Sequence, residues 1–269
     1  MDYNQLFTTE LHSPFFLIAG PCAIENEDTP FAIARELKSI CEDLSIPLIF
    51  KGSYRKANRS SIHSFTGIGD KKALEILAAI GKEYNIPTTT DIHADNEAQF
   101  AAEHVDVLQI PAFLCRQTSL ITAAAKTGKI VSIKKGQFMS PQSMKHAVNK
   151  VRESGNDKVL LIERGTTFGY QDLVVDYRGI PEMKSFNIPV VMDCTHALQQ
   201  PNQASGITGG KPALISTIAK AAVAVGADGL FIETHPDPKN AKSDGANMLP
   251  LSQIRKLLEQ LLRISEAVR

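Results

Sequence analysis

FFLIAGPC, residues 15–22, is a continuous apolar run that ends in a polar residue able to do chemistry, Cys22. Seven further apolar runs follow, over residues 47–51, 87–91, 105–109, 130–134, 159–164, 189–196 and 229–233. They end in Lys51, Asp91, Gln109, Lys134, Arg164, His196 and Glu233. Short apolar runs of this kind are typical of strands buried on both faces of a parallel sheet.

Helical patterns follow most of these runs. Apolar residues recur at helical spacing from Thr29-Pro30 onward and over 71–82, and further helices are expected over 94–102, 117–126, 140–153, 181–185, 212–225 and 250–267. Strand and helix alternating eight times predict a single (β/α)8 barrel domain over residues 1–269, with a short N-terminal extension before residue 14. The active site is therefore expected at the carboxyl ends of the strands.

Composition restricts the possible classes of function. The formal net charge is zero, which argues against a general nucleic-acid binder. No apolar run approaches the roughly 20 residues of a membrane helix, and no secretory signal is recognisable. The four cysteines show no CxxC spacing, so reduced thiols or metal ligands are expected rather than disulfides. We expect a cytoplasmic protein.

Basic residues gather at or just after the expected strand ends. They are Lys51, Arg55, Lys56, Arg59, Arg116, Lys134, Lys135 and Arg164, and Asn58, Ser60 and Ser61 add neutral donors. A neutral protein with its cations at one rim concentrates small anions there. The number of cations exceeds what one monophosphate needs, so two anionic substrates or one with several anionic groups are expected. A solvated basic loop over 51–61 is the alternative.

A second set of side chains suits a metal ion. Cys22, His196 and Glu233 end the first, seventh and eighth strands, which are neighbours in a closed barrel, and Asp244 lies in the following loop. Sulfur, nitrogen and oxygen donors together suit Zn²⁺, Fe²⁺ or Mn²⁺. The alternative is a core cysteine and a structural histidine. His93 and His235 also lie near this rim, as further ligands or as partners of the ligands.

Two loops are long for a barrel, 52–70 and the glycine-rich 199–211. Long glycine-containing loops at the catalytic face are candidate lids over a substrate. A surface excursion without function is the alternative.

Several motifs carry a resemblance to a known family. They are IAGPCAI (18–24), KANRSSIHS (56–64), QIPAFLCRQ (109–117), KKGQF (134–138), ERGTTFGY (163–170) and ETHPDP (233–238). From about residue 15 to 251 the chain resembles 3-deoxy-D-manno-octulosonate 8-phosphate synthase. The resemblance implies condensation of phosphoenolpyruvate with D-arabinose 5-phosphate and water, releasing phosphate and giving a lipopolysaccharide precursor. Cys22 resembles the metal-dependent class, which implies the ligands Cys22, His196, Glu233 and Asp244.

The resemblance also implies roles for single residues. Phosphoenolpyruvate contacts would map to Lys51, Lys56, Gln109, Ala112, Lys134 and Arg164, and pentose phosphate contacts to Asn58, Arg59 and Ser60. Asp91 and Gln199 are further candidate substrate-binding residues, and Lys51, Lys134, His196 and Asp244 are candidate catalytic residues. The family is usually tetrameric, with Phe113 and Arg116 reaching a neighbour's site. The chain departs from the family pattern at Gly52, where Ala or Ser is usual, and at Arg55, where Asp is usual.

Three alternative functions remain open at this point. The first is a 3-deoxy-heptulosonate-phosphate synthase using erythrose 4-phosphate, against which the loop of Asn58 and Arg59 argues. The second is a Schiff-base aldolase using Lys134. The third is a non-catalytic anion-binding barrel. In the favoured activity, the metal either polarises the aldehyde or lowers the pKa of a bound water.

Overall fold

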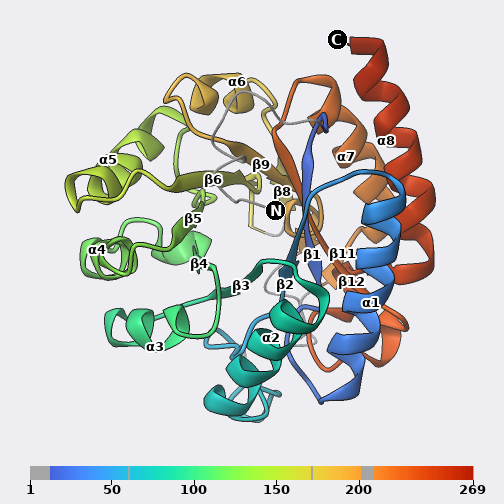
Figure 1. Ribbon diagram of the computed structural model, residues 1–269. Helices are drawn as coiled ribbons and strands as arrows, with labels where there is room; N and C mark the ends of the chain where they lie inside the picture. The colour runs from blue at the N-terminus through green and yellow to red at the C-terminus, as the bar shows by residue number, and fades with distance from the viewer. Residues whose placement is uncertain (1–12, 60, 171, 201–208, 269) are drawn as a thin grey trace.

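A closed barrel of eight parallel strands forms the centre of the molecule (Figure 1). The computed structural model describes residues 13–59, 61–170, 172–200 and 209–268. The strand order is β1-β2-β3-β4-β5-β6-β9-β12, and β12 pairs again with β1. The barrel strands are β1 (Phe16–Gly20), β2 (Leu48–Lys51), β3 (Thr88–Asp91), β4 (Val107–Ile110), β5 (Ile130–Lys134), β6 (Val159–Glu163), β9 (Val190–Asp193) and β12 (Gly229–His235). The predicted (β/α)8 fold is confirmed.

Helices surround the strands in chain order, and α8 lies beside α1 and α7 (Figure 1). They are α1 (Asp28–Asp43), α2 (Asp70–Tyr84), α3 (Ala98–Ala102), α4 (Thr118–Lys126), α5 (Lys145–Glu153), α6 (Gly179–Lys184), α7 (Ile215–Ala224) and α8 (Ile254–Val268). Four of these helices follow directly on a short 3₁₀ turn. In order, α3, α5, α7 and α8 follow η2 (Asp95–Glu97), η4 (Gln142–Met144), η6 (Pro212–Leu214) and η9 (Leu251–Gln253).

Alternation along the strands divides the core into two regions. Phe16 and Ile18 point into the barrel, where they join a cluster with Phe231 and other buried residues. Leu17 and Ala19 point outward to the larger cluster between strands and helices. Successive side chains of a strand point to opposite faces, so every barrel strand must be apolar on both sides. This requirement explains the continuous apolar runs in the sequence.

Short extra strands extend the loops that follow the late barrel strands. β7 (Thr166–Phe168) pairs with β8 (Asp172–Val174) after β6, and β10 (Gln199–Gln200) pairs with β11 (Gly209–Gly210) after β9. β13 (Leu249–Pro250) adds to the end of β12. The expected lid over 199–211 is described only at its two ends. The N-terminal extension, apart from Ser13, and Ser60 lie outside the described residues.

Cys22 and His196 were predicted to end their strands, but in the structure both lie beyond the last residue of the strand. β1 ends at Gly20, so Cys22 follows the strand by two residues, and β9 ends at Asp193, so His196 begins the 3₁₀ turn η5 (His196–Leu198). A Cβ on Gly20 would lie 1.9 Å from the carbonyl oxygen of Lys51. Glycine therefore permits the close approach of β1 to β2 just before Cys22.

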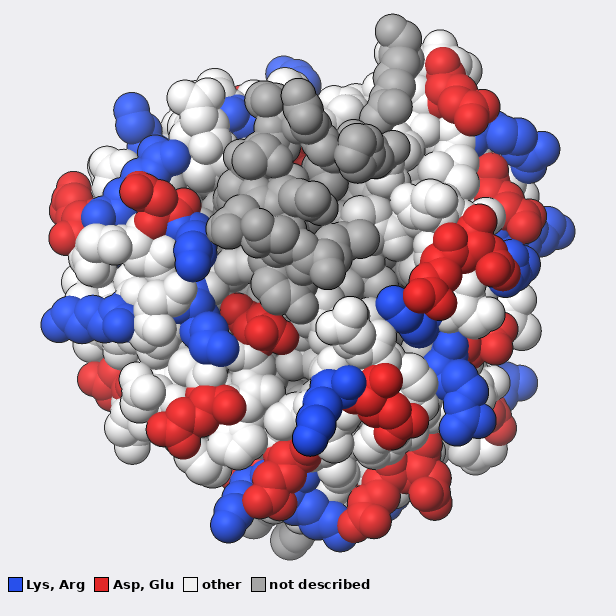
Figure 2. Space-filling model, in the orientation of Figure 1, with Lys and Arg blue, Asp and Glu red and all other residues white. Residues whose placement is uncertain are grey.

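Charged side chains of both signs are interspersed on the visible part of the face drawn in Figure 2. Among the described residues, no helix is long and apolar enough to cross a membrane.

Candidate active site

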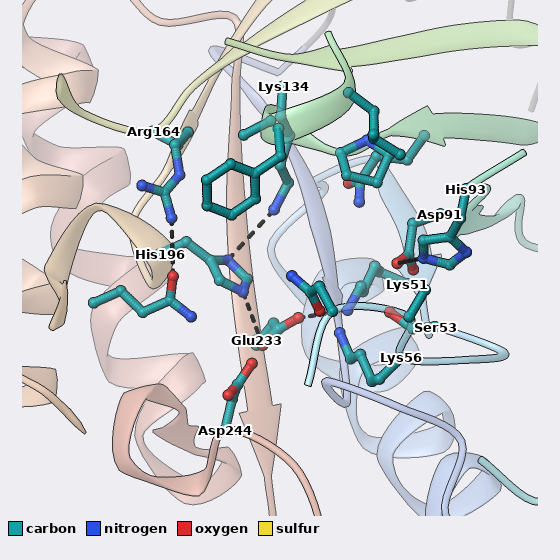
Figure 3. A pocket seen from close by; sticks show the side chains of 18 of the residues that line it. Lys51, Ser53, Lys56, Asp91, His93, Lys134, Arg164, His196, Glu233 and Asp244 are labelled. Atoms are coloured by element: carbon teal, nitrogen blue, oxygen red, sulfur yellow. Dashed lines mark hydrogen bonds and ion pairs between the residues drawn. The ribbon is translucent and has the colours of Figure 1, made fainter. Parts of the chain in front are cut away.

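A cavity of about 350 Å³ opens at the carboxyl ends of the barrel strands (Figure 3). The predicted strand-end residues Lys51, Asp91, Gln109, Lys134, Arg164, His196 and Glu233 all line it. The candidate residues Lys56, Asn58, Ala112, Phe113, Gln199 and Asp244 line it as well. The eight-fold alternation thus brings side chains from all around the barrel to one place.

Some candidate residues lie outside the cavity wall. Cys22 and Arg59 stand just behind it, next to Asp244. Arg116 lines a separate cavity beside Cys115, between the β4–α4 and β5–α5 segments. Lys135 points away from the site, where its ammonium group contacts Glu163 at 3.3 Å and several carbonyl oxygens. The expectation that all strand-end cations converge is therefore wrong for Lys135, because neighbouring residues of a strand face opposite sides.

Arg164 contributes a buried cation to the cavity. Its Nη2 donates to Gln199 Oε1 at 2.9 Å, and its Nη1 has no hydrogen-bond partner within the described part of the chain. Burial lowers the pKa of Arg164, and the negative charges of Asp193 and Glu163 partly offset this effect. A buried guanidinium with an unused donor is suited to bind a carboxylate or phosphate.

Other buried polar atoms of the cavity wall also lack protein partners among the described residues. They include Ser53 Oγ, Asp91 Oδ1 and Gln137 Oε1. Buried polar groups are normally hydrogen-bonded, so groups of this kind that face a cavity indicate a polar ligand. Sequence reasoning missed Ser53 and Gln137, although Gln137 lies within the KKGQF motif.

Asp193 is the central carboxylate of the β5–β9 side and was missed by sequence reasoning. It is fully buried and accepts hydrogen bonds from Lys134 Nζ at 2.6 Å and from the ring of His196 at Nδ1, at 2.8 Å. Burial alone would raise the pKa of Asp193, but His196 and Lys134 hold it well below its ordinary value. Burial lowers the pKa of Lys134, and Asp193 counteracts this.

This arrangement orients the imidazole of His196. Asp193 holds Nδ1, and the ring lies against Phe231. Nε2 faces Glu233 Oε2 at 3.4 Å (Figure 3). A carboxylate on one ring nitrogen with the other nitrogen free is the usual arrangement of a metal-binding histidine. Asp193 ends its strand directly and could have been found by that signal.

Cys22, Glu233 and Asp244 form a compact donor cluster. One donor atom from each lies within 4.8 Å of the others, and His196 adjoins the cluster through Glu233. Glu233 Oε2 is buried without a hydrogen-bond partner in the described chain. Three of the four expected ligands thus lie together, and His196 adjoins them only through Glu233. Thiol and carboxylate donors beside an imidazole suit a borderline divalent ion.

Lys51 supplies a positive charge beside this cluster. Lys51 Nζ donates to Glu233 Oε1 and, at 2.8 Å, to the carbonyl of Cys22. Burial raises the pKa of the Cys22 thiol to about 12, with a further contribution from Glu233. Because a bound cation favours the thiolate, metal binding there would release the thiol proton.

The two remaining histidines near the rim behave differently. His93 lines the cavity, and its Nε2 lies 3.0 Å from Asp91 Oδ2. His235 is bonded at Nε2 to Glu25 and accepts at Nδ1 from the backbone of Asp237. Neither belongs to the donor cluster formed by Cys22 and its neighbours.

The β2–α2 loop touches the donor cluster through Arg59. Arg59 Nη2 donates to Ser243 Oγ, which lies 2.9 Å from Cys22 Sγ, and Nη1 lies 3.9 Å from Asp244 Oδ1. Arg59 Nε donates to the carbonyl of Phe65 at 2.9 Å. The loop predicted to bind an anion therefore reaches two of the predicted metal ligands. Arg59 approaches Asp244 directly and reaches Cys22 through Ser243.

Comparison with known proteins gives similarity over nearly the whole chain. Residues 10–269 match the DAHP synthetase I family. The chain is 53% identical over 256 residues to a 2-dehydro-3-deoxyphosphooctonate aldolase of Koribacter versatilis, covering 94% of this chain and 92% of that protein. It is 53% identical to the protein of that name from Agrobacterium fabrum, over 92% of this chain and 88% of the relative. It is 51% identical to the protein of the same name from Brucella ovis, over 95% of this chain and 94% of the relative.

Proposed function

We propose that this chain, which belongs to the DAHP synthetase I family, condenses phosphoenolpyruvate with D-arabinose 5-phosphate and water. The products are 3-deoxy-D-manno-octulosonate 8-phosphate and inorganic phosphate. The printed name of the relatives, 2-dehydro-3-deoxyphosphooctonate aldolase, supports an eight-carbon product over the seven-carbon product of a heptulosonate-phosphate synthase. The product would serve as a lipopolysaccharide precursor.

One observation carries this proposal more than any other. One cavity wall contains the buried guanidinium of Arg164, whose Nη1 has no partner among the described residues, and also Glu233 and Asp244 of the donor cluster. Phosphoenolpyruvate brings a carboxylate and a phosphate, and the pentose brings a second phosphate. Those groups account for the surplus of cations. A non-catalytic anion-binding barrel has no need for the donor cluster.

In this proposal, phosphoenolpyruvate occupies the side of the cavity formed by β2 to β6. Arg164 and Lys134 bind its anionic groups, and Lys51, Lys56, Gln109 and Ala112 complete the subsite. Each charge-assisted hydrogen bond contributes roughly 1.5–3 kcal/mol, so a few such bonds are enough for micromolar affinity.

The pentose phosphate occupies the neighbouring space under the β2–α2 loop. Asn58 and Arg59 bind its phosphate, together with Ser60, which lies outside the described residues. Asp91 and Gln199 would bind sugar hydroxyl groups. Both residues line the cavity, and Asp91 Oδ1 has no partner in the described chain, which supports this assignment.

Cys22, His196, Glu233 and Asp244 would hold one divalent ion, with Zn²⁺, Fe²⁺ and Mn²⁺ as the candidates. When bound, such an ion supplies Lewis acidity toward an aldehyde oxygen or a water molecule. Asp193 holds the Nδ1 proton of His196, so that Nε2 stays available as a ligand.

The chemistry forms a bond between C3 of phosphoenolpyruvate and the aldehyde carbon of the pentose. Water adds to C2, and phosphate leaves with cleavage of its bond to C2. Lys134 and Lys51 stabilise the anionic groups while charge builds up, and the cavity holds the two substrates face to face. Such orientation can lower the barrier by roughly 7–11 kcal/mol.

We also place this enzyme in the cytoplasm as a homotetramer. All four cysteines are buried and unpaired, which suits a reducing compartment. Phe113, at the cavity mouth, is 59% exposed, and Phe138 is 55% exposed, which suits coverage by a second copy of the chain. Arg116, three residues after Phe113, would reach the neighbouring site in that assembly.

Phosphate release with a panel of aldoses tests the proposal. The purified chain receives phosphoenolpyruvate with arabinose 5-phosphate or with erythrose 4-phosphate. Turnover with the pentose phosphate at much higher kcat/KM is expected. A preference for erythrose 4-phosphate would instead establish the heptulosonate activity, and borohydride trapping of substrate on Lys134 would establish a Schiff-base aldolase.

A further inference from the structure

Arg55 is a cation of the β2–α2 loop that does not line the cavity. Its Nη1 lies 3.0 Å from Asp70 Oδ2, and its Nη2 binds Glu97 Oε1. Asp70 is the first residue of α2, and Glu97 closes the 3₁₀ turn η2 after β3. One planar guanidinium therefore joins the beginning of the loop, its end and the neighbouring loop, a geometry that the single ammonium of lysine cannot reproduce.

Glu97 is the acceptor at the centre of this arrangement. Its Oε2 accepts from the hydroxyl of Tyr54 at 2.5 Å and from the backbone N–H of His93 at 2.7 Å. Tyr54 is almost fully buried, and its ring lies 5.5 Å from the guanidinium carbon of Arg55. Glu97 thus links Tyr54 and Arg55, at the beginning of the β2–α2 loop, to His93, which contacts Asp91 in the cavity wall.

Further contacts close the loop at the same place. The backbone N–H of Lys56 donates to the carbonyl of Thr66 at 2.8 Å. Gly67 packs so closely that a Cβ there would lie 2.9 Å from the carbonyl oxygen of Tyr54, and its φ of +153° also favours glycine. The segment between these closures carries Lys56 and Asn58 in the cavity wall, and Arg59 against Ser243.

We propose that Arg55 is a positioning residue that bridges Asp70 and Glu97 and thereby holds the β2–α2 loop in place over the cavity for the phosphorylated aldose. Arg55 touches no substrate in this arrangement. It acts through the segment that it closes, and chiefly through Asn58 and Arg59, which lie farther along the loop than Lys56. The choice of the aldose as ligand rests on the proposed function.

Replacement of Arg55 by methionine keeps much of the aliphatic stem and removes both bridges. Arg55→Met is expected to raise the KM of arabinose 5-phosphate about ten- to a hundredfold, the range that loss of positioning produces. The KM of phosphoenolpyruvate should rise much less, and kcat should change little. Arg55→Lys can keep only one bridge at a time. Its KM for arabinose 5-phosphate should therefore lie between the values for the wild type and for Arg55→Met.

Arg255→Met is the matched control. Arg255 pairs with Asp43 between α8 and α1 with similar exposure, 42% against 35% for Arg55, and it lies outside the cavity wall. The control should leave both KM values unchanged. If Arg55→Met lowers only the thermal midpoint, to the same extent as the control and with unchanged KM values, Arg55 has a purely structural role and the proposal is overturned.

Hydrogen exchange of the full chain gives a readout that does not depend on turnover. Amides over 56–69 should exchange faster in Arg55→Met than in the wild type, whereas amides of α8 should not change. Unchanged exchange over 56–69 would refute the bridge even if the wild type makes the expected product. If the wild type does not use arabinose 5-phosphate, the proposed function fails, and faster exchange over 56–69 would still support the bridge.

Discussion

At the scale of single residues, a few buried charges determine what the cavity can bind. Arg164 and Asp193 are 5% and 0% exposed, and both are charged. Buried charges are costly unless they are paired, and Asp193 is paired with Lys134 and His196. Arg164 instead keeps one donor free within the described structure. We expect this donor, Nη1 of Arg164, to bind the anionic ligand.

Arg164→Met should weaken the binding of phosphoenolpyruvate. Loss of one or two charge-assisted hydrogen bonds predicts a rise in its KM of about ten- to a hundredfold, with a smaller effect on the pentose phosphate. Steady-state kinetics with each substrate varied in turn measures both values. Arg178→Met, which alters an exposed arginine paired with Asp176, is the control. A larger rise in the KM of the pentose phosphate than in that of phosphoenolpyruvate would show that the two subsites are assigned the wrong way round.

At the scale of elements, the sequence predicted the strands better than the side chains around them. All eight barrel strands were found, because each must be apolar on both faces. Residues just beyond a strand were harder to place. His196 was taken as a strand end, so Asp193, the true end of β9, was overlooked. Lys135 was counted with Lys134, although the two side chains point in opposite directions.

The contacts of Arg55 were also beyond sequence reasoning. The resemblance showed only that a cation replaces the usual acidic residue, and nothing in the local sequence points to Glu97 as its partner. The two residues lie 42 positions apart and meet because β2 and β3 are neighbours in the barrel. Long-range pairs of this kind depend on the closed sheet rather than on any motif.

The β2–α2 loop as an element should determine affinity for the aldose. Arg59→Ala is expected to raise the KM of arabinose 5-phosphate far more than that of phosphoenolpyruvate, because Arg59 belongs to the loop assigned to the pentose phosphate. The metal content of the variant must be measured as well, since Arg59 also contacts Ser243 and approaches Asp244. Equal effects on both substrates at unchanged metal content would argue against the assignment.

At the scale of the whole molecule, exposed aromatic side chains favour self-association. Phe113, Phe138 and Phe168 are 59%, 55% and 71% exposed, and the backbone of Thr167 donates to the carbonyl of Gln137, which brings the last two segments together. Light scattering should show a tetramer, and Phe113→Asp should reduce its size. Val225→Asp, at the C-terminal end of α7, is the control. A wild-type monomer at micromolar concentration would contradict the assembly.

The barrel as a whole brings an imidazole and two carboxylates to the same cavity as a group of cations, with the thiol of Cys22 just behind the wall. Turnover of phosphoenolpyruvate and arabinose 5-phosphate by chelator-stripped protein, before and after addition of a divalent ion, tests this convergence most directly. Elemental analysis verifies that the stripped protein is free of metal. We predict no turnover in the stripped protein and recovery with Zn²⁺, Fe²⁺ or Mn²⁺. Full turnover by verified metal-free protein would contradict the account.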